Sequence, residues 1–319
     1  MTSTAMSPRA TTQQEPSGPS LRPRRRRGDR MPYWLVLPSV VVIAAVLAYP
    51  LFQLLSLSLQ QYRLKELLKG KGEFIGLKNY QAILTDPFFW QVVLRSVLFT
   101  AVAVTATIGI GTGIALLMRR MNRAMRIALN VVLILVWAIP GLVSIVVFQW
   151  MVDFEFGVVN YLLTKLGLDF DKHNWFENPV QGFAVIAALV VWGALPFVVI
   201  TLYAGLTQVP RELEEAAMVD GATGRQVFWN VTMPVLRPVY VILTSLSVIW
   251  DFMVFQQIWV MLNGRPTPDY YTIGVYSFVQ SFGVNDYGKG SAIAVIMVLM
   301  LLSVTWIYIR QMVKIGEVK

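Results

Sequence analysis

Long apolar runs separated by short polar segments dominate the pattern of this sequence. A membrane-spanning helix needs roughly 20 predominantly apolar residues. Six segments meet that requirement, at residues 33–58, 96–118, 127–150, 182–206, 238–262 and 290–309. The first of them belongs to an uncharged stretch, residues 31–62, which is much longer than a signal-peptide core of about 7–15 residues. We therefore predict an all-α integral membrane protein with six transmembrane helices, the first of them retained as an anchor.

The composition agrees with a protein that faces lipid. Hydrophobic residues make up 56% of the chain and charged residues only 14%, against about 25% charged in soluble domains. The net charge of +9 is concentrated in residues 1–30, an Arg-rich segment without large apolar residues, which we predict to be a disordered tail preceding a permease domain at 31–319. The charge is thus local and indicates no nucleic-acid partner. No cysteine is present, and the lone histidine, His173, is not expected to bind a metal.

The distribution of Lys and Arg predicts the orientation. Positive charge is enriched in cytoplasmic loops. It gathers in the N-terminal tail, at residues 119–126, at residues 211–237 and at the C-terminal end, whereas the loops at 151–181 and 263–289 hold few basic residues. The loop at 60–90 is basic and disagrees with this pattern, but the other loops outnumber it. We predict cytoplasmic termini and a multi-pass protein of the cell membrane.

The loop at 207–237 has the signals of two short helices on the cytoplasmic side. Pro210 suits the first turn of a helix, and Gly221 suits the left-handed residue that ends one. Three glutamates near Pro210 are favoured by the helix dipole. A second helix is predicted from about Thr223 to Val231, with Pro234 and Pro238 marking the entry into the fifth span. On these grounds alone the loop is equally compatible with a solvated amphipathic linker.

The spacing within this loop resembles a known motif. Glu215-Ala216-Ala217, three residues, Gly221, nine residues and Val231-Thr232-Met233-Pro234 resemble the EAA motif of ABC importer permeases, with Val231 and Met233 in place of Ile and Leu. The resemblance implies a MetI-like core and a coupling helix in a groove of an ATPase. Ala216 and Ala217 would then allow close approach, Glu215 would offer a charged partner, and Gly221 would allow the turn. Implied partners are cytoplasmic ATPase subunits, a second homologous permease, an extracytoplasmic solute-binding protein and membrane lipid.

The chain is predicted to bind no cofactor and to have no ATP site of its own. A phosphate-binding loop needs Gly, four residues, then Gly-Lys and Ser or Thr. Gly288-Lys289-Gly290-Ser291 lacks that spacing and is interpreted as a turn before the last span. ATP would therefore be used by the partner subunit. A membrane-embedded enzyme lacks a convergent catalytic set here, and a secondary transporter would leave the EAA-like loop without a role; the latter remains the less favoured alternative.

Two further stretches bear on the substrate. Residues 74–80, Phe-Ile-Gly-Leu-Lys-Asn-Tyr, resemble the F-x-G-L-x-N-Y signature of carbohydrate permeases of the maltose-transporter (MalF-like) type, and residues 287–292 also resemble that group. The T-G-G-G-P stretch of the same group is reduced here to Asn263-Gly264-Arg265-Pro266. The resemblance implies a sugar or related polyol. A non-sugar solute is the alternative, and an ordinary glycine-containing turn is the alternative for residues 74–80.

Polar and aromatic residues within the spans are candidates for the substrate pathway. Intramembrane polar groups mark such pathways, and flat aromatic faces suit sugars. Asp251 near the centre of the fifth span is the main candidate; its alternative is a structural partner. The tryptophans can equally be interfacial anchors. Pro140 and Pro196 are predicted to kink the third and fourth spans. The candidate pathway residues are Asp251, Gln256, Gln257, Trp192 and Trp150.

Overall fold

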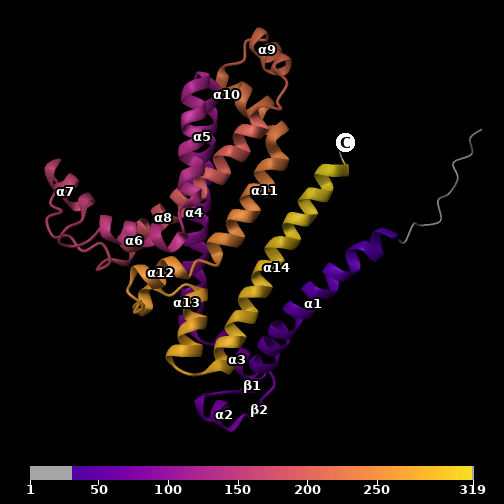
Figure 1. The fold of residues 1–319 in the computed structure, drawn as a ribbon, viewed down its shortest axis with the longest axis vertical. Coiled ribbons are helices and arrows are strands. Elements are labelled where there is room, and N and C mark those ends of the chain that lie inside the picture. The colour runs from indigo at the N-terminus through magenta and orange to yellow at the C-terminus, as the bar shows by residue number, and fades with distance from the viewer. Residues whose placement is uncertain (1–30, 318–319) are drawn as a thin grey trace, which may run out of the picture. The chain divides into compact units, whose positions relative to one another are not determined.

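The computed structural model describes residues 31–317, and the predicted N-terminal tail lies outside them. The chain divides into two units, residues 1–50 and residues 51–319. Helices account for nearly all of the regular structure (Figure 1). The elements are α1 Met31–Ser58, β1 Gln60–Gln61, α2 Leu64–Lys69, β2 Glu73–Phe74, α3 Lys78–Leu84, α4 Pro87–Arg120, α5 Arg123–Ala138, α6 Gly141–Met151, α7 Val158–Lys165, α8 Pro179–Leu206, α9 Arg211–Val219, α10 Gly224–Val227, η1 Phe228–Thr232, α11 Met233–Phe252, α12 Gln256–Met261, η2 Pro268–Tyr270, α13 Ile273–Phe278, η3 Val279–Gly283 and α14 Tyr287–Glu317.

The predicted spans correspond to real helices. Five helical segments of the described chain are long and apolar enough to cross a membrane: Trp34–Ser58, Pro87–Arg120, Pro179–Leu206, Gly224–Phe252 and Tyr287–Val313. A sixth is the pair α5 and α6, which meets the same criterion only when both are counted together. The prediction of an all-α membrane fold is confirmed, with six spans if the pair is one.

The third span is bent far more sharply than a kinked helix. The axes of α5 and α6 differ by 98°, with Ile139 and Pro140 at the break. Proline lacks the N–H that continues a helix, and its ring clashes with the carbonyl four residues before it. The kink predicted at Pro140 is confirmed. Its size makes 127–150 two helices instead of the single one that the apolar run predicts.

The predicted fifth span, 238–262, is wrong at both ends. The helix begins earlier, at Gly224, and ends at Phe252, and α12 is a separate helix after a break at Met253–Phe255. Asp251 therefore lies one residue before a helix end and not near a span centre. No Gly or Pro stands at residues 253–255, so the apolar run gave no local sign of this break.

Pro234 and Pro238 lie inside the continuous span and do not interrupt it. The widened turn of η1, a π-helix, comes just before them and includes Asn230, four residues before Pro234. In a regular α-helix the Pro234 ring would clash with that carbonyl. A π-turn shifts the carbonyls by one residue, which explains why the helix passes through the proline.

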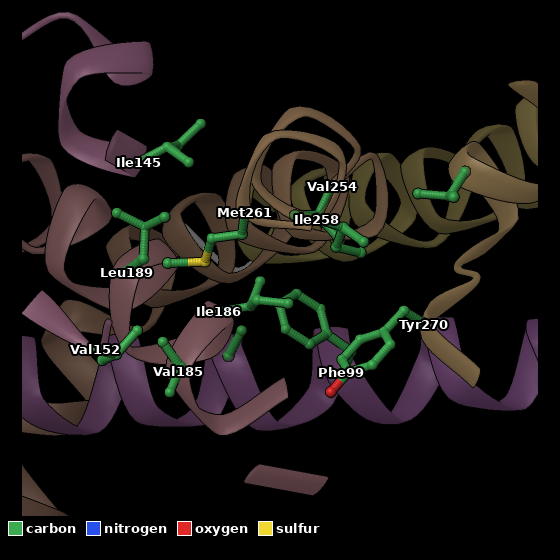
Figure 2. Packing of buried hydrophobic residues seen from close by; sticks show 12 residues of the cluster. Phe99, Ile145, Val152, Val185, Ile186, Leu189, Val254, Ile258, Met261 and Tyr270 are labelled. Atoms are coloured by element: carbon green, nitrogen blue, oxygen red, sulfur yellow. The ribbon is translucent and has the colours of Figure 1, made fainter. Parts of the chain in front are cut away.

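The buried core joins the middle of the spans to the loops that follow them. Its largest cluster takes residues from α4, α6, α8, α12 and α13, together with Val152, Val254 and Tyr270 (Figure 2). Ile186 and Ile258 in this cluster are fully buried. At the start of α4, the guanidinium of Arg95 donates to the carbonyl oxygens of Pro268 and Tyr271, at 2.9 and 3.0 Å. Together these contacts hold α12 and η2 against α4 and α8.

A small hairpin and the start of α14 form one connected structure, which we call the hairpin clasp: residues 58–63, 73–80 and 286–290. The strands β1 and β2 pair antiparallel, with Gln60 opposite Phe74. The backbone N–H of Gly288 donates to Tyr62 at 3.1 Å, and Arg63 forms an ion pair with Asp286 at 3.0 Å. The clasp lies at the opposite end of α4 from α9 (Figure 1).

Candidate functional site

The loop between α8 and α11 has the predicted order of helix, glycine turn and helix. Pro210 is the N-cap of α9, one residue before the predicted position. At the other end, the N–H of Gly221 donates to Met218 and the N–H of Ala222 donates to Ala217, at 3.1 and 3.0 Å. This pair of bonds is a Schellman motif, which requires a left-handed residue; Gly221 has φ of 85°. The sequence thus specifies both ends of α9.

The two faces of α9 differ in their exposure. Glu214 and Ala217, three residues apart, are its half-buried positions, whereas Glu215 and Ala216 are exposed. Val219 is an exposed apolar side chain on the same outward face. No residue of α9 is buried. Half of the EAA-like motif therefore faces away from the rest of the described chain, where another molecule can reach it. Pro234 is also exposed, but on the first turn of α11.

Glu214 on the inward face joins α9 to two spanning segments. The Arg119 guanidinium at the end of α4 donates to both carboxylate oxygens of Glu214, at 2.9 and 2.7 Å. The Thr232 hydroxyl of η1 donates to the same carboxylate at 2.8 Å. The bonds from Arg119, more than the other contacts, hold the pKa of Glu214 below its ordinary range, so the carboxylate is charged at neutral pH.

A cavity of about 440 Å³ lies where two of the spans are interrupted. Its walls come from the α5–α6 bend, from the middle of α8 and from the break after α11. Irregular backbone at membrane depth is tolerated where it lines a cavity or is enclosed by protein. The lining residues are Val136, Trp137, Ile139, Gly141, Ser144, Ile145, Leu189, Val190, Trp192, Gly193, Ala194, Phe197, Trp250, Asp251, Val254 and Gln257.

Asp251 is the unusual member of this lining. Only 5% of it is exposed, and its Oδ2 atom has no hydrogen-bond partner among the described residues. Buried polar atoms without a partner are rare in native structures and require an explanation, such as a ligand or water. Trp192 lies against Phe148, with ring centroids 5.5 Å apart, and presents an aromatic wall in the same cavity.

The structure brings together three of the five candidate pathway residues. Asp251, Gln257 and Trp192 line the cavity, whereas Gln256 and Trp150 do not. Gln256 is exposed at the start of α12, and Trp150 is 65% exposed near the end of α6. The break after α11 and the bend before α6 change the direction of both side chains. A pathway role stays a prediction for all five residues.

Arg119 and Thr232 are functional candidates that the sequence pattern did not reveal. Arg119 entered only as one of several basic residues at positions 119–126, and Thr232 only as the variable position of the motif. Arg119 is 95 residues away from Glu214 in the sequence, and Thr232 is 18 residues away. They come close to Glu214 only because α4 packs against α11. Pattern alone has no means of pairing them.

The two stretches that suggested a sugar contribute no residue to the lining of this cavity, and they meet each other in the hairpin clasp. Asn79 donates to the carbonyl oxygens of Ser58 and Gln60 at 3.0 and 2.9 Å, and the Tyr80 hydroxyl donates to the Ser58 hydroxyl at 2.7 Å. A side chain at Gly288 would overlap the Gln60 carbonyl oxygen. Their polar groups are thus occupied in holding β1, α3 and α14 together.

Six potential spans, a motif-bearing helix exposed beyond them and a cavity at their breaks define a polytopic membrane transport protein. A family model identifies it further. The chain belongs to the family of binding-protein-dependent transport system inner membrane components, whose model matches residues 106–311. It is thus the membrane permease subunit of an importer and not an enzyme, as the EAA-like motif predicted.

Similar proteins extend over nearly the whole chain. The diacetylchitobiose uptake system permease protein DasB of Streptomyces coelicolor is 38% identical, over 96% of this chain and 98% of that protein. The sulfoquinovosyl glycerol transport system permease protein SmoG of Agrobacterium fabrum is 33% identical, over 89% and 91%. A crystal structure of a bacterial ABC transporter involved in alginate import has the same fold, with a TM-score of 0.72 at 19% identity, over 88% of this chain and 96% of that one.

Proposed function

We propose that this permease translocates a carbohydrate or glycoside and is driven by separate ATPase subunits through α9. The observation that carries the proposal is the similarity to DasB and SmoG, whose names give a sugar derivative as the substrate. An extracytoplasmic solute-binding protein would deliver the substrate, in keeping with the description of the family. A second homologous permease would complete the pathway, and membrane lipid would surround the spans.

The cavity at Asp251 is the proposed substrate pathway. At about 440 Å³ it is within the range of about 300–1,000 Å³ for small-molecule sites. Sugars present hydroxyl groups at their edges and apolar C–H faces. The Oδ2 atom of Asp251, which has no partner among the described residues, would accept a bond from a hydroxyl group, and Trp192 offers a flat aromatic face. Gln257 adds a second polar contact from α12.

The exposed face of α9 is the proposed contact with the ATPase. Glu215 and Ala216 are exposed there, and Gly221 sets the turn that follows. Closure of the ATPase dimer on ATP would displace α9 and switch the permease between inward-open and outward-open states. Hydrolysis takes place in the partner, so this chain supplies the docking helix and the pathway.

The test is uptake by proteoliposomes that contain this chain with its cognate permease, ATPase subunits and binding protein. We expect ATP-dependent uptake of at least one labelled glycoside from a panel that includes diacetylchitobiose and maltose. Histidine serves as the non-sugar solute. Uptake of histidine but of no glycoside in the panel would overturn the carbohydrate assignment. Purification of this permease with no ATPase subunit bound to it would overturn the ATP-driven mechanism.

Asp251→Asn separates a pathway role from a structural one. The change leaves the shape nearly unchanged but replaces a carboxyl oxygen with an amide NH2, which cannot accept a bond from a substrate hydroxyl, so uptake should fall several-fold, since one hydrogen bond contributes about 0.5–1.5 kcal/mol. The Oδ2 atom has no hydrogen bond within the described chain to lose, so thermal stability should stay equal or rise. Gln256→Ala, outside the cavity, is the control. A loss of stability with normal uptake per folded molecule would make Asp251 structural.

A further inference from the structure

The helix α9 has little holding it to the rest of the permease. None of its residues is buried. Among the described residues, Glu214 is the one side chain of α9 that makes a hydrogen bond beyond the helix and its turn. A displacement of α9 by a partner therefore passes through its two chain ends, through its packing on η1 and α10, and through the hydrogen bonds of Glu214.

Glu214 connects three elements at one point, the Arg119–Glu214–Thr232 junction. Arg119 is the second-last residue of α4, a 34-residue helix that packs along α8 and α11. Thr232 is the last residue of the π-turn that leads into α11, and it is 2% exposed. Glu214 itself is close to α9's centre. The junction thus binds α9 to the ends of two spanning helices.

The geometry of the junction makes it stiff. Arg119 meets the carboxylate with two parallel bonds of 2.9 and 2.7 Å, the bidentate arrangement that fixes both distance and orientation. The two side chains are only 27% and 14% exposed, so water and salt weaken the pair less than they weaken a surface pair. Thr232 adds a third bond, and π-turns such as η1 frequently occur at functional sites.

We propose that the Arg119–Glu214–Thr232 junction transmits the displacement of α9 to α4 and α11, and that Arg119 and Glu214 are positioning residues for coupling. The proposal rests on the proposed function of α9 as the ATPase-contacting helix. In this arrangement Glu215, next in sequence, faces the partner, while Glu214 faces the permease. Glu215 therefore contributes to binding of the ATPase, and Glu214 contributes to transmission of the displacement.

The proposal predicts a change in coupling and not in assembly. In the reconstituted full transporter, Glu214→Gln and Arg119→Gln should each lower the substrate taken up per ATP hydrolysed about five- to tenfold, within the usual span of couplings between sites. The ATPase subunits should still copurify, because the outward face of α9 is unchanged. Thr232→Val, which removes one hydroxyl, should have a smaller effect, about twofold.

A double-mutant cycle shows whether the two residues act through each other. Each single change leaves a partly buried partner without its bond, so the double variant should couple no worse than the poorer single variant. Arg126→Gln is the matched control, since Arg126 lies at the same end and donates to the Tyr203 hydroxyl at 2.7 Å without bonding α9. It should keep the wild-type ratio.

Three results would overturn the proposal: wild-type coupling in both single variants, multiplied losses in the double variant, or loss of the ATPase subunits from the Glu214→Gln complex. The last would make Glu214 a docking residue. These outcomes differ from failure of the proposed function, which would appear in the wild-type transporter as uptake independent of ATP.

Discussion

The α9 loop and the hairpin clasp both carry motif-like stretches, but they use their residues in opposite ways. In α9 the side chains of Glu215 and Ala216 are exposed. In the clasp, Asn79 and Tyr80 have their polar groups bonded to the end of α1 and to β1. A motif left unused within its own chain indicates a partner, whereas one used internally indicates a constraint of the fold.

This difference changes what the sugar-like stretches mean. Residues 74–80 and 287–292 resemble carbohydrate permeases, yet their contacts in the clasp are structural. They identify relatives whose substrates are sugars without themselves reaching the cavity at Asp251. Specificity is therefore expected in the cavity, and the clasp is expected to keep the start of α14 in place.

The largest expected effect is on the clasp. Gly288→Val introduces a side chain against the Gln60 carbonyl oxygen and should destabilise the protein by about 3 kcal/mol, the upper part of the range for overpacking. The thermal midpoint of the purified protein in detergent measures it. Gly113→Val, at a glycine with open space around it, is the control. Equal midpoints for the two variants would contradict the tight packing of Gly288.

A substitution on the outward face of α9 should weaken binding of the ATPase without lowering the stability of the permease. Ala216 is exposed, so Ala216→Arg should leave the midpoint unchanged, but its bulk and charge should weaken ATPase binding about tenfold or more. Copurification and titration of the ATPase subunit measure the loss. Ala124→Arg, an exposed alanine in the first turn of α5, should bind normally. Normal ATPase binding by Ala216→Arg would remove α9's outward face from the interface.

The smallest effect tests whether the clasp influences specificity. Asn79→Ala loses two bonds to backbone carbonyls and should cost about 1–2 kcal/mol of stability. The ratio of uptake rates for two competing glycosides should stay at the wild-type value. Lys78→Ala, exposed and adjacent, controls for the stability change. A change in the ratio of the two uptake rates would show that the clasp contributes to substrate selection, and would contradict the assignment of specificity to the cavity alone.

Sequence patterns predicted most of the spans because lipid requires long apolar helices, and Pro210 and Gly221 specified α9. They failed where packing decides. The apolar run over residues 238–262 continues through the break after Phe252, because residues 253–255 are as apolar as the helices on either side of them. The same limit applies to the site. Asp251 stands out in the sequence as an intramembrane acid. Whether the side chains of Gln256 and Trp150 point into the cavity depends on the direction of the helix that follows each break, which the sequence pattern does not give. Arg119 was recognisable only as a charge.

The π-turn at Phe228–Thr232 makes the register of this region sensitive to chain length. One residue corresponds to about 100° of rotation and 1.5 Å of rise along a helix. Deleting Asn230 would force the turn towards ordinary α-helix, in which the Pro234 ring would meet a carbonyl of the preceding turn, so the deletion also carries a local cost. It would also swing everything before it, α9 included, about a quarter of the way around the α11 axis. Single-residue insertions and deletions in this turn are therefore expected to uncouple α9 from the membrane-spanning helices, while α9 and those helices stay folded.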